Sequence, residues 1–375
     1  MNKELHIISF NVPFPANYGG VVDVFYRLVA LHSLGIKIHL HCFDYARGEQ
    51  EELNKYCASV NYYPREIGHK AISLHLPYIV ASRRNQHLID NLLKDDHPIL
   101  MEGVHCSYPL TDERFKKRKI YVRLHNVEYQ YYQDLYKSAT SLFRKLYYWN
   151  ESRLLRKYES ELAGKAHFFS ISESDNEVYR KEFGCQRIEL LPVFLPNWEM
   201  SCSEGMGTYC LYQGDLSVDA NEKAVIWLLK DVFMKIKLPL VIAGQNPSEK
   251  LIELAHQQSH SCMVENPSEK EMQDMIAKAH INVIPSFTNT GMKVKLLNAL
   301  INGKHCVANK ATLEGSNLEN YCHQADTKEA FQGAIVELFE RSFTPDEKNK
   351  RLKTMSNLFN NTRNAQKLAN LIWEA

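Results

Sequence analysis

Short runs of apolar, strand-forming residues alternate with longer amphipathic stretches along the whole chain. Such alternation is typical of β-α-β units, in which a parallel sheet is flanked by helices. In the first half the pattern predicts strands over residues 5–10, 37–43, 98–103, 119–126, 166–172 and 188–193. In the second half it predicts strands over residues 208–214, 238–244, 261–266, 281–286 and 305–309. The chain is therefore expected to be an α/β protein.

The rhythm breaks once, between residues 195 and 208, where Pro, Ser and Gly interrupt regular structure. This break predicts a linker between a first domain over residues 1–195 and a second over 208–343. The length of 375 residues supports two domains, because a single core seldom grows beyond about 250 to 300 residues. Residues 344–375 begin with a capping sequence and are expected to be helical.

The composition indicates which kinds of binding partner and which cell compartment to expect. Lys and Arg number 45 against 44 Asp and Glu, so no overall field attracts nucleic acid, and no nucleic-acid partner is expected. Nine cysteines without a Cys-x-x-Cys pair indicate reduced thiols in the cytoplasm, and no apolar run reaches the length of a membrane span. Residues 142–158 mix basic and aromatic side chains. They fit either an amphipathic helix in peripheral contact with the inner face of a membrane or a helix with a solvated basic face.

Polar residues stand where strands of the first half end. Gly19 and Gly20 precede a predicted helix over about 21–34, where backbone amides can approach a phosphate or sugar oxygen. His125 and Asn126 end one predicted strand, and Glu102 ends the strand before it. Since the carboxyl ends of parallel strands meet at one sheet edge, Glu102 is expected near His125. His125 is expected to line a cleft between the domains and to bond a substrate hydroxyl. A tight turn for the glycines and a structural role for the histidine are the alternatives.

Further motifs follow one another at strand ends of the second half. They are LYQGD (211–215), LVIAG (240–244) and GMKVKLLN (291–298). Their order resembles the C-terminal, donor-binding domain of the GT-B glycosyltransferases of family 4, and Gly19-Gly20 and the strand end at His125-Asn126 fit the same family. The resemblance implies a GT-B architecture with two Rossmann-like domains, in which the first holds the acceptor, the second holds the donor nucleotide, and the final helix packs back on the first.

The activity implied by the resemblance is transfer of a hexose, with mannose as one candidate, from a nucleotide-diphosphate sugar to a glycan or lipid-linked acceptor. Transfer would proceed with retention and without a metal or other cofactor, in the synthesis of a surface polysaccharide. A helix starting near Gly291 would offer the amides of Met292 and Lys293 to the diphosphate, with Lys293 or Lys295 as the cation. His125 and Glu102 would be the catalytic residues. Further donor contacts are assigned to Gly214, Asp215, Lys223 and Asn298.

The chain also departs from the family pattern. The paired glutamates of the family fall at Thr290 and Asn298, and its arginine after the first glycine of the domain is replaced by Asp215. Lys223 is a loose substitute for a later family lysine. Two other functions therefore stay open: a GT-B relative that binds sugar nucleotide or glycan without transferring sugar, and a sugar-nucleotide epimerase.

Overall fold

The computed structural model describes residues 3–139, 141–198, 203–288 and 291–374 and divides into two compact units. The first unit comprises residues Met1–Pro196 and Phe359–Ala375, and the second comprises Asn197–Leu358. The boundary at Pro196 falls in the expected linker. The terminal helical region is shared, because α13 (Pro345–Leu358) belongs to the second unit and α14 (Asn361–Trp373) to the first.

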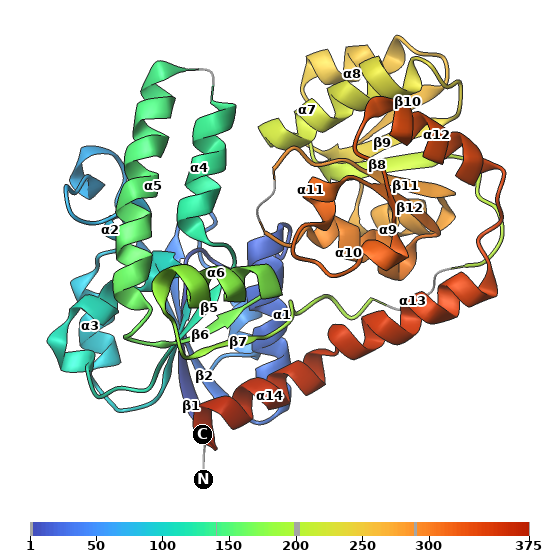
Figure 1. The fold of residues 1–375 in the computed structure, drawn as a ribbon. Coiled ribbons are helices and arrows are strands. Elements are labelled where there is room, and N and C mark those ends of the chain that lie inside the picture. The colour runs from blue at the N-terminus through green and yellow to red at the C-terminus, as the bar shows by residue number, and fades with distance from the viewer. Residues whose placement is uncertain (1–2, 140, 199–202, 289–290, 375) are drawn as a thin grey trace. The chain divides into compact units, whose positions relative to one another are not determined.

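The first unit contains a seven-stranded parallel sheet with the order β3-β2-β1-β4-β5-β6-β7 (Figure 1). Its strands are β1 (Glu4–Ser9), β2 (Lys37–Asp44), β3 (Ser59–Pro64), β4 (Ile99–Glu102), β5 (Ile120–Leu124), β6 (His167–Ser170) and β7 (Ile188–Leu190). Its helices, besides α14, are α1 (Gly19–Ser33), α2 (Tyr78–Ala81), α3 (Gln86–Leu92), α4 (Glu128–Ser138), α5 (Leu142–Leu162) and α6 (Glu173–Phe183).

Both faces of this sheet are apolar, so each strand is buried on two sides. On one face Leu5, Ile7 and Leu40 pack with α1 and α14, and on the other Ile8 and Met101 pack with α3 and α5. The last helix is fixed to the sheet by polar contacts as well. The hydroxyl of Tyr121 donates to the Leu371 carbonyl at 3.2 Å, and the Asn361 side chain bonds both backbone groups of Leu195.

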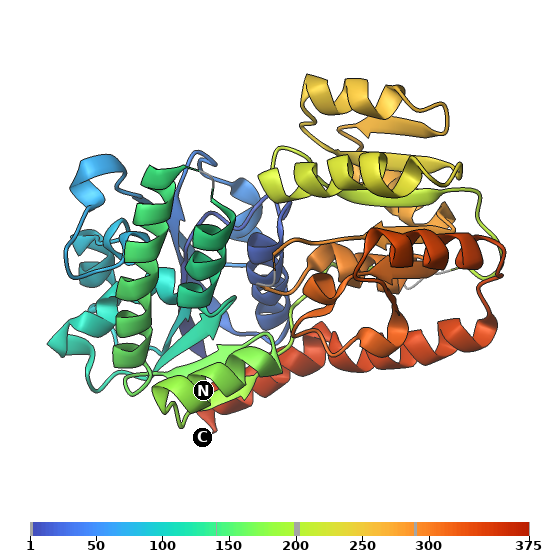
Figure 2. The same cartoon turned by 45° about the horizontal axis from the view of Figure 1, so that its top comes forward.

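The second unit contains a six-stranded parallel sheet with the order β10-β9-β8-β11-β12-β13. Its strands are β8 (Cys210–Asp215), β9 (Leu240–Gln245), β10 (Ser261–Glu265), β11 (Ile281–Ile284), β12 (His305–Ala308) and β13 (His323–Gln324). Its helices, besides α13, are α7 (Asp219–Trp227), α8 (Glu249–His256), α9 (Glu269–Lys278), α10 (Val294–Asn302), α11 (Lys310–Leu313) and α12 (Lys328–Phe339) (Figure 2). The residues of α7, α8 and α12 cover one face, and those of α9 cover the other.

The eleven predicted strands all occur at the expected places, and the structure adds β3 and β13. Both additions are edge strands, and β13 has only two residues, so neither carries a strong apolar run. None of the described helices combines the length and apolar character that a membrane crossing requires.

Candidate functional site

His125 and Glu102 lie together at the carboxyl edge of the first sheet, as their strand-end positions predicted. Glu102 ends β4, which pairs with β5, and His125 follows the last residue of β5. Nε2 of His125 is 3.1 Å from Oε2 of Glu102. Nδ1 of the same ring has no hydrogen bond to the residues that the structure describes. The carboxylate therefore fixes the ring orientation and leaves Nδ1 for a substrate group.

A buried network of charged side chains holds Glu102 in place. Arg27 donates to Oε1 of Glu102 and, at 2.8 Å, to Asp23, and Arg123 donates to both oxygens of Asp23 at 3.1 Å. These four side chains are almost fully buried, and two guanidinium groups balance two carboxylates. Burial works to raise the pKa of Asp23, but the charges of Arg123 and Arg27 outweigh it and hold that pKa well below its ordinary value. The network keeps Glu102 in one position, with Oε2 toward His125.

The glycine pair brings the start of α1 close to His125. A Cβ at Gly20 would lie 2.8 Å from Cζ of Phe10, so glycine lets the helix approach this ring without displacing it. The ring of Phe10 in turn meets the ring of His125 edge to face, with centroids 5.5 Å apart. The helix begins at Gly19, and its first-turn amides have no carbonyl partner inside the helix. Gly19 and Gly20 thus present backbone donors beside the histidine.

The start of α4 adds two buried carboxyl groups that the sequence did not single out. Glu159 accepts bonds from the amides of Glu128 and Tyr129, at 3.0 and 2.9 Å, and so caps the helix from a distance of thirty residues. Burial, followed by the charge of Glu159, raises the pKa of Glu128 to about 8, and burial raises the pKa of Glu159 to about 7. The Asn126 side chain is hydrogen bonded to Glu128.

His105 is a second histidine at the carboxyl edge of the first sheet. Its Nδ1 and Oε1 of Glu128 are buried, have no hydrogen-bond partners among the described residues and are 3.9 Å apart. Burial, with the positive charges of Arg83 and His125, lowers the pKa of His105 well below its ordinary value. The ring also lies 5.5 Å from that of Phe10, centroid to centroid. The edge therefore carries His125, His105 and a carboxyl group that holds a proton near neutral pH.

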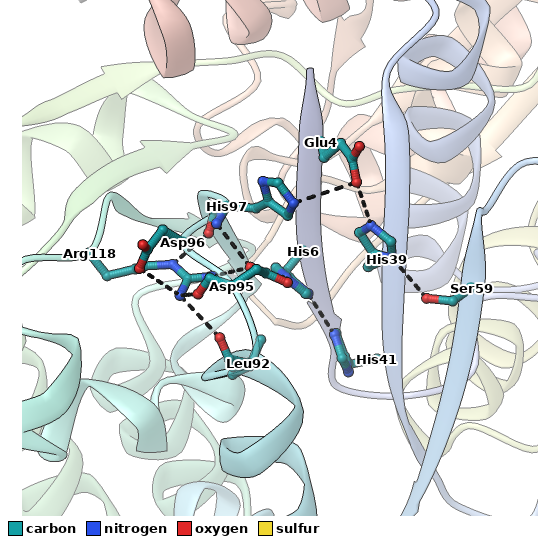
Figure 3. Close-up of polar contacts among 10 residues, drawn as sticks. All are labelled: Glu4, His6, His39, His41, Ser59, Leu92, Asp95, Asp96, His97 and Arg118. Atoms are coloured by element: carbon teal, nitrogen blue, oxygen red, sulfur yellow. Dashed lines mark hydrogen bonds and ion pairs between the residues drawn. The ribbon is translucent and has the colours of Figure 1, made fainter. Parts of the chain in front are cut away.

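Other histidines of the first unit cluster at the opposite, amino edge of the sheet (Figure 3). His6 bonds His41 at 2.9 Å and Asp95 at 3.0 Å, while His39 bonds Glu4 at 3.1 Å. Each ring is engaged within the cluster, and Arg118 donates a further bond to Asp95. The histidines of β1 and β2 therefore have a structural role.

Two groups of histidine and carboxylate side chains have ligand atoms within 4.8 Å of one another among the described residues. In each group an arginine is already bonded to a carboxylate. Asp23 and Glu102 bind the arginines described above, and Arg341 donates to Glu347 at 2.8 Å in the group formed with His305 and His323. A guanidinium in each group supplies the positive charge that a metal would bring, so these residues do not fit a cation site.

In the second unit, Gly214 and Asp215 end β8 beside the end of β9. A Cβ at Gly244 would lie 1.9 Å from the carbonyl oxygen of Gly214, its partner on β8. A glycine at position 244 is therefore needed for the two strand ends to lie this close together. The Asp215 carboxylate accepts bonds from the amide and the hydroxyl of Ser217, at 3.1 and 2.7 Å, and so shapes the loop before α7. Lys223 lies exposed on α7.

The helix assigned to the diphosphate begins later than the sequence indicated. α10 starts at Val294, with Lys293 as its N-cap, because Gly291 has a φ of +70°, which is incompatible with the helix. The expected start near Gly291 is therefore wrong, and Met292 and Lys293 precede the helix. Within the described residues, the first-turn amides without a carbonyl partner are those of Val294 and Lys295, since the amide of Leu296 donates to the Lys293 carbonyl. Thr290 lies outside the described residues.

The two lysines of this segment differ in their surroundings. Nζ of Lys295 donates to Tyr212 at 3.1 Å and to Asn221 at 3.0 Å, and it lies 4.7 Å from the centroid of the Tyr212 ring. Burial, together with the charge of Lys293, lowers the pKa of Lys295 to about 7. Nζ of Lys293 donates to the Thr288 hydroxyl at 3.3 Å. Lys295 therefore ties α10 to β8, and Lys293 is the cation placed at the N-cap of α10.

Asn298 is nearly buried inside the second unit. Its exposed fraction is 7%, and its Oδ1 accepts a bond from Nδ2 of Asn302 at 2.7 Å. Asn302 also donates to Gln273 of α9 at 3.2 Å. The position that the resemblance assigns to the ribose is thus part of an amide chain between α10 and α9.

Comparison with known proteins identifies the class of this fold and relates the second unit to a known family. Residues 207–341 match the family model described as "Glycosyl transferases group 1". An uncharacterized 44.6 kDa protein in the cps region of Klebsiella pneumoniae is 26% identical over 332 residues, which cover 84% of each chain.

Solved structures match the chain over its full length. The structure of TarM has a TM-score of 0.70 at 10% identity and covers 100% of this chain and 99% of that one. The structure of WaaG, a glycosyltransferase involved in lipopolysaccharide biosynthesis, has a TM-score of 0.66 at 11% identity. The match covers 99% of this chain and 100% of that one. The chain is therefore a glycosyltransferase with the GT-B fold, and its residues 207–341 are those that match the group 1 glycosyl transferases.

Proposed function

We propose that the protein transfers a hexose from a nucleotide-diphosphate sugar to a glycan or lipid-linked acceptor with retention, without a metal, in the cytoplasm. Mannose is one candidate for the sugar. The observation that carries the proposal is the pair His125–Glu102, held by a buried ionic network at the carboxyl edge of a parallel sheet. Catalytic groups in open α/β sheets occupy this edge, and a group there must be held rigidly to favour a transition state.

The second unit supplies what a nucleotide diphosphate requires. The start of α10 offers the amides of Val294 and Lys295, and Lys293 adds a positive charge next to them. Together they would stabilise the charge that develops on the leaving diphosphate, which is the task of a metal in other transferases. These features support donor binding by the second unit, and retention follows the resemblance.

A role in a surface polysaccharide is supported by the relatives. One relative is encoded in a cps region, and WaaG is involved in lipopolysaccharide biosynthesis. The eight cysteines that the structure describes are free thiols, in keeping with a cytoplasmic enzyme.

The test is a transfer assay with radiolabelled UDP- and GDP-hexoses, lipid-linked acceptors extracted from cells, and EDTA. We expect transfer in the presence of EDTA, with the anomeric configuration of the donor retained in the product. A strict requirement for Mn²⁺ or Mg²⁺ would contradict the metal-free mechanism. Inversion at the anomeric carbon would contradict retention.

Asn298 favours a second candidate, a relative that binds sugar nucleotide or glycan without transferring sugar. An amide replaces the carboxylate expected from the family, and its oxygen is already bonded to Asn302. Calorimetric binding of UDP or GDP, combined with neither transfer nor hydrolysis of any donor, would establish this candidate.

A further inference from the structure

The tip of the hairpin formed by α4 and α5 exposes large apolar side chains. Leu142 and Phe143, at the start of α5, are 82% and 88% exposed, and Leu146 and Trp149 follow on the next two turns. Positions 142, 146 and 149 recur at the spacing of one helix face. The rest of α5 is anchored separately, because residues of its later turns are in the core: Leu155, Tyr158 and Leu162. The exposed stripe is therefore not needed to hold the hairpin in place.

A second exposed apolar segment lies beside this tip. The backbone amide of Tyr78 donates to Glu151 of α5 at 2.7 Å, and the rings of Tyr78 and Tyr147 meet edge to face. A groove of about 400 Å³ runs between the two segments and is lined by Ile72 and Tyr147, among others. We call the combined surface the apolar tip surface; it consists of Ile67, Ile72, Leu74, Leu142, Phe143, Leu146 and Trp149.

Basic residues accompany the apolar tip surface. Residues 67–78 and 136–150 contain four Lys and Arg and no Asp or Glu. Arg144 and Lys145 form no ion pair within the described part of the chain, and the guanidinium of Arg153 lies 4.8 Å from the centroid of the Trp149 ring. Glu66, next to Ile67, Asp134, which pairs with Lys137, and Glu151, which lines the groove, mark the acidic limits of the region. Arg144 and Lys145 thus place two positive charges, without an acidic partner among the described residues, beside the apolar side chains.

We propose that the apolar tip surface docks on an anionic membrane, with Phe143, Leu146 and Trp149 at the level of the headgroups and Arg144 and Lys145 against lipid phosphates. Exposed Leu and Phe side chains gain free energy at the acyl boundary, and Trp and Arg are suited to the interface between lipid and water. Positive residues near an anionic surface strengthen binding, which explains why the charges surround the apolar side chains. A tip that projects beyond the carboxyl edge of its sheet (Figure 1) suits a flat surface. The proposal does not rest on the transfer reaction, because lipid binding is measured without donor or acceptor.

The first test is co-sedimentation of the full chain with vesicles. We expect binding to vesicles of phosphatidylcholine mixed with phosphatidylglycerol, and much weaker binding to phosphatidylcholine alone. The double variant Arg144→Gln/Lys145→Gln should weaken binding to the anionic vesicles about tenfold or more, since each charge contributes separately. The matched control Lys116→Gln/Lys117→Gln removes two exposed charges from another basic stretch of the same unit and should bind like the wild type.

The second test addresses the apolar side chains. The variant Phe143→Ser/Leu146→Ser should lose most vesicle binding, whereas Met234→Ser/Val336→Ser, which changes two exposed apolar residues of the second unit, should not. All four side chains are exposed, so the fold should be retained, and circular dichroism checks this. Addition of anionic vesicles should shift the tryptophan emission of the wild type to the blue, and Trp149→Phe should abolish the shift.

Three outcomes would overturn the proposal. The first is wild-type protein that fails to bind anionic vesicles. The second is undiminished binding by Phe143→Ser/Leu146→Ser. The third is an oligomer in sedimentation velocity that this variant converts to a monomer while vesicle binding is absent, because the surface would then be an interface between copies of the chain.

Discussion

Arg27 and His125 contact the two oxygens of a single carboxylate, that of Glu102. The arginine is fully buried and the histidine reaches the surface, so one side chain connects the interior of the first unit to its candidate site. A carboxylate bound in this way cannot turn away from the histidine without breaking a buried ion pair. The position of the imidazole is thereby coupled to the stability of the core.

Loss of Arg27 should therefore destabilise the protein strongly. In Arg27→Met, Glu102 loses its buried partner and Asp23 loses one of two, and we expect a fall of about 3 to 5 kcal/mol in the free energy of unfolding. The double variant Arg27→Met/Glu102→Gln removes charge of both signs and should be less destabilised than the single one. Urea unfolding measures the free energy of unfolding of both variants. A loss of less than about 1 kcal/mol in the single variant would show that the network is not a main source of stability.

Replacement of His125 should affect catalysis rather than folding. If Nδ1 bonds a substrate group mainly in the transition state, His125→Ala should lower kcat by about 10² or more with an unchanged circular dichroism spectrum. The exposed His256 of the second unit provides the control, His256→Ala. Steady-state rates within about threefold of the wild type would remove His125 from the catalytic residues.

Glu128 and Glu159 should make the protein less stable as the pH rises. Their folded pKa values, about 8 and about 7, lie above the ordinary value for glutamate, so the folded state binds more protons between about pH 4.3 and pH 8. The stability from these groups is complete below about pH 4.3 and is lost as the pH passes through 7 to 8. Glu128→Gln should flatten this fall in urea unfolding at about pH 6 and about pH 9. The exposed Glu161→Gln should retain the wild-type slope, and an equal slope in both variants would contradict the assignment.

A carboxylate at position 298 should strengthen nucleotide binding. In Asn298→Glu one oxygen can keep the bond from Asn302 while the second accepts from ribose with charge assistance. We expect binding of UDP or GDP to tighten by about 0.5 to 1.5 kcal/mol in calorimetry. Gln273→Glu places the same charge nearby on α9 and serves as the control. Equal effects of the two variants would indicate a general electrostatic cause, and no binding by any variant at millimolar concentration would argue against the donor site.

The sequence predicted the features that depend on local pattern. Strand periodicity located both sheets, and the rule that parallel strands end at one edge brought Glu102 to His125. The capping sequence at residue 344 predicted the terminal helical region, and Thr344 and Glu347 cap each other at the start of α13. These signals extend over a few residues or follow from the topology.

Polar contacts between residues far apart in the chain could not be predicted from the sequence in the same way. Glu159 caps α4 from the last turn of α5, and Lys295 bonds Tyr212 across more than eighty residues. Nothing in the local sequence marks such pairs. Asp23 and Arg27 did carry a signal, since an acid and a base four residues apart stand on the apolar face of a helix, where charged side chains need buried partners.

The place of α14 in the first unit has a consequence for synthesis on the ribosome. The strands of that unit are all made before residue 197, yet the helix that covers Tyr121 and Phe169 is made only after the entire second unit. Domains that fold as they emerge do so from the amino end. The part of that sheet face which α14 covers must then remain exposed while residues 197–358 are translated, and a chaperone or the nascent second unit has that interval in which to bind it. Folding of the first unit can be completed only after residues 361–373 have been made.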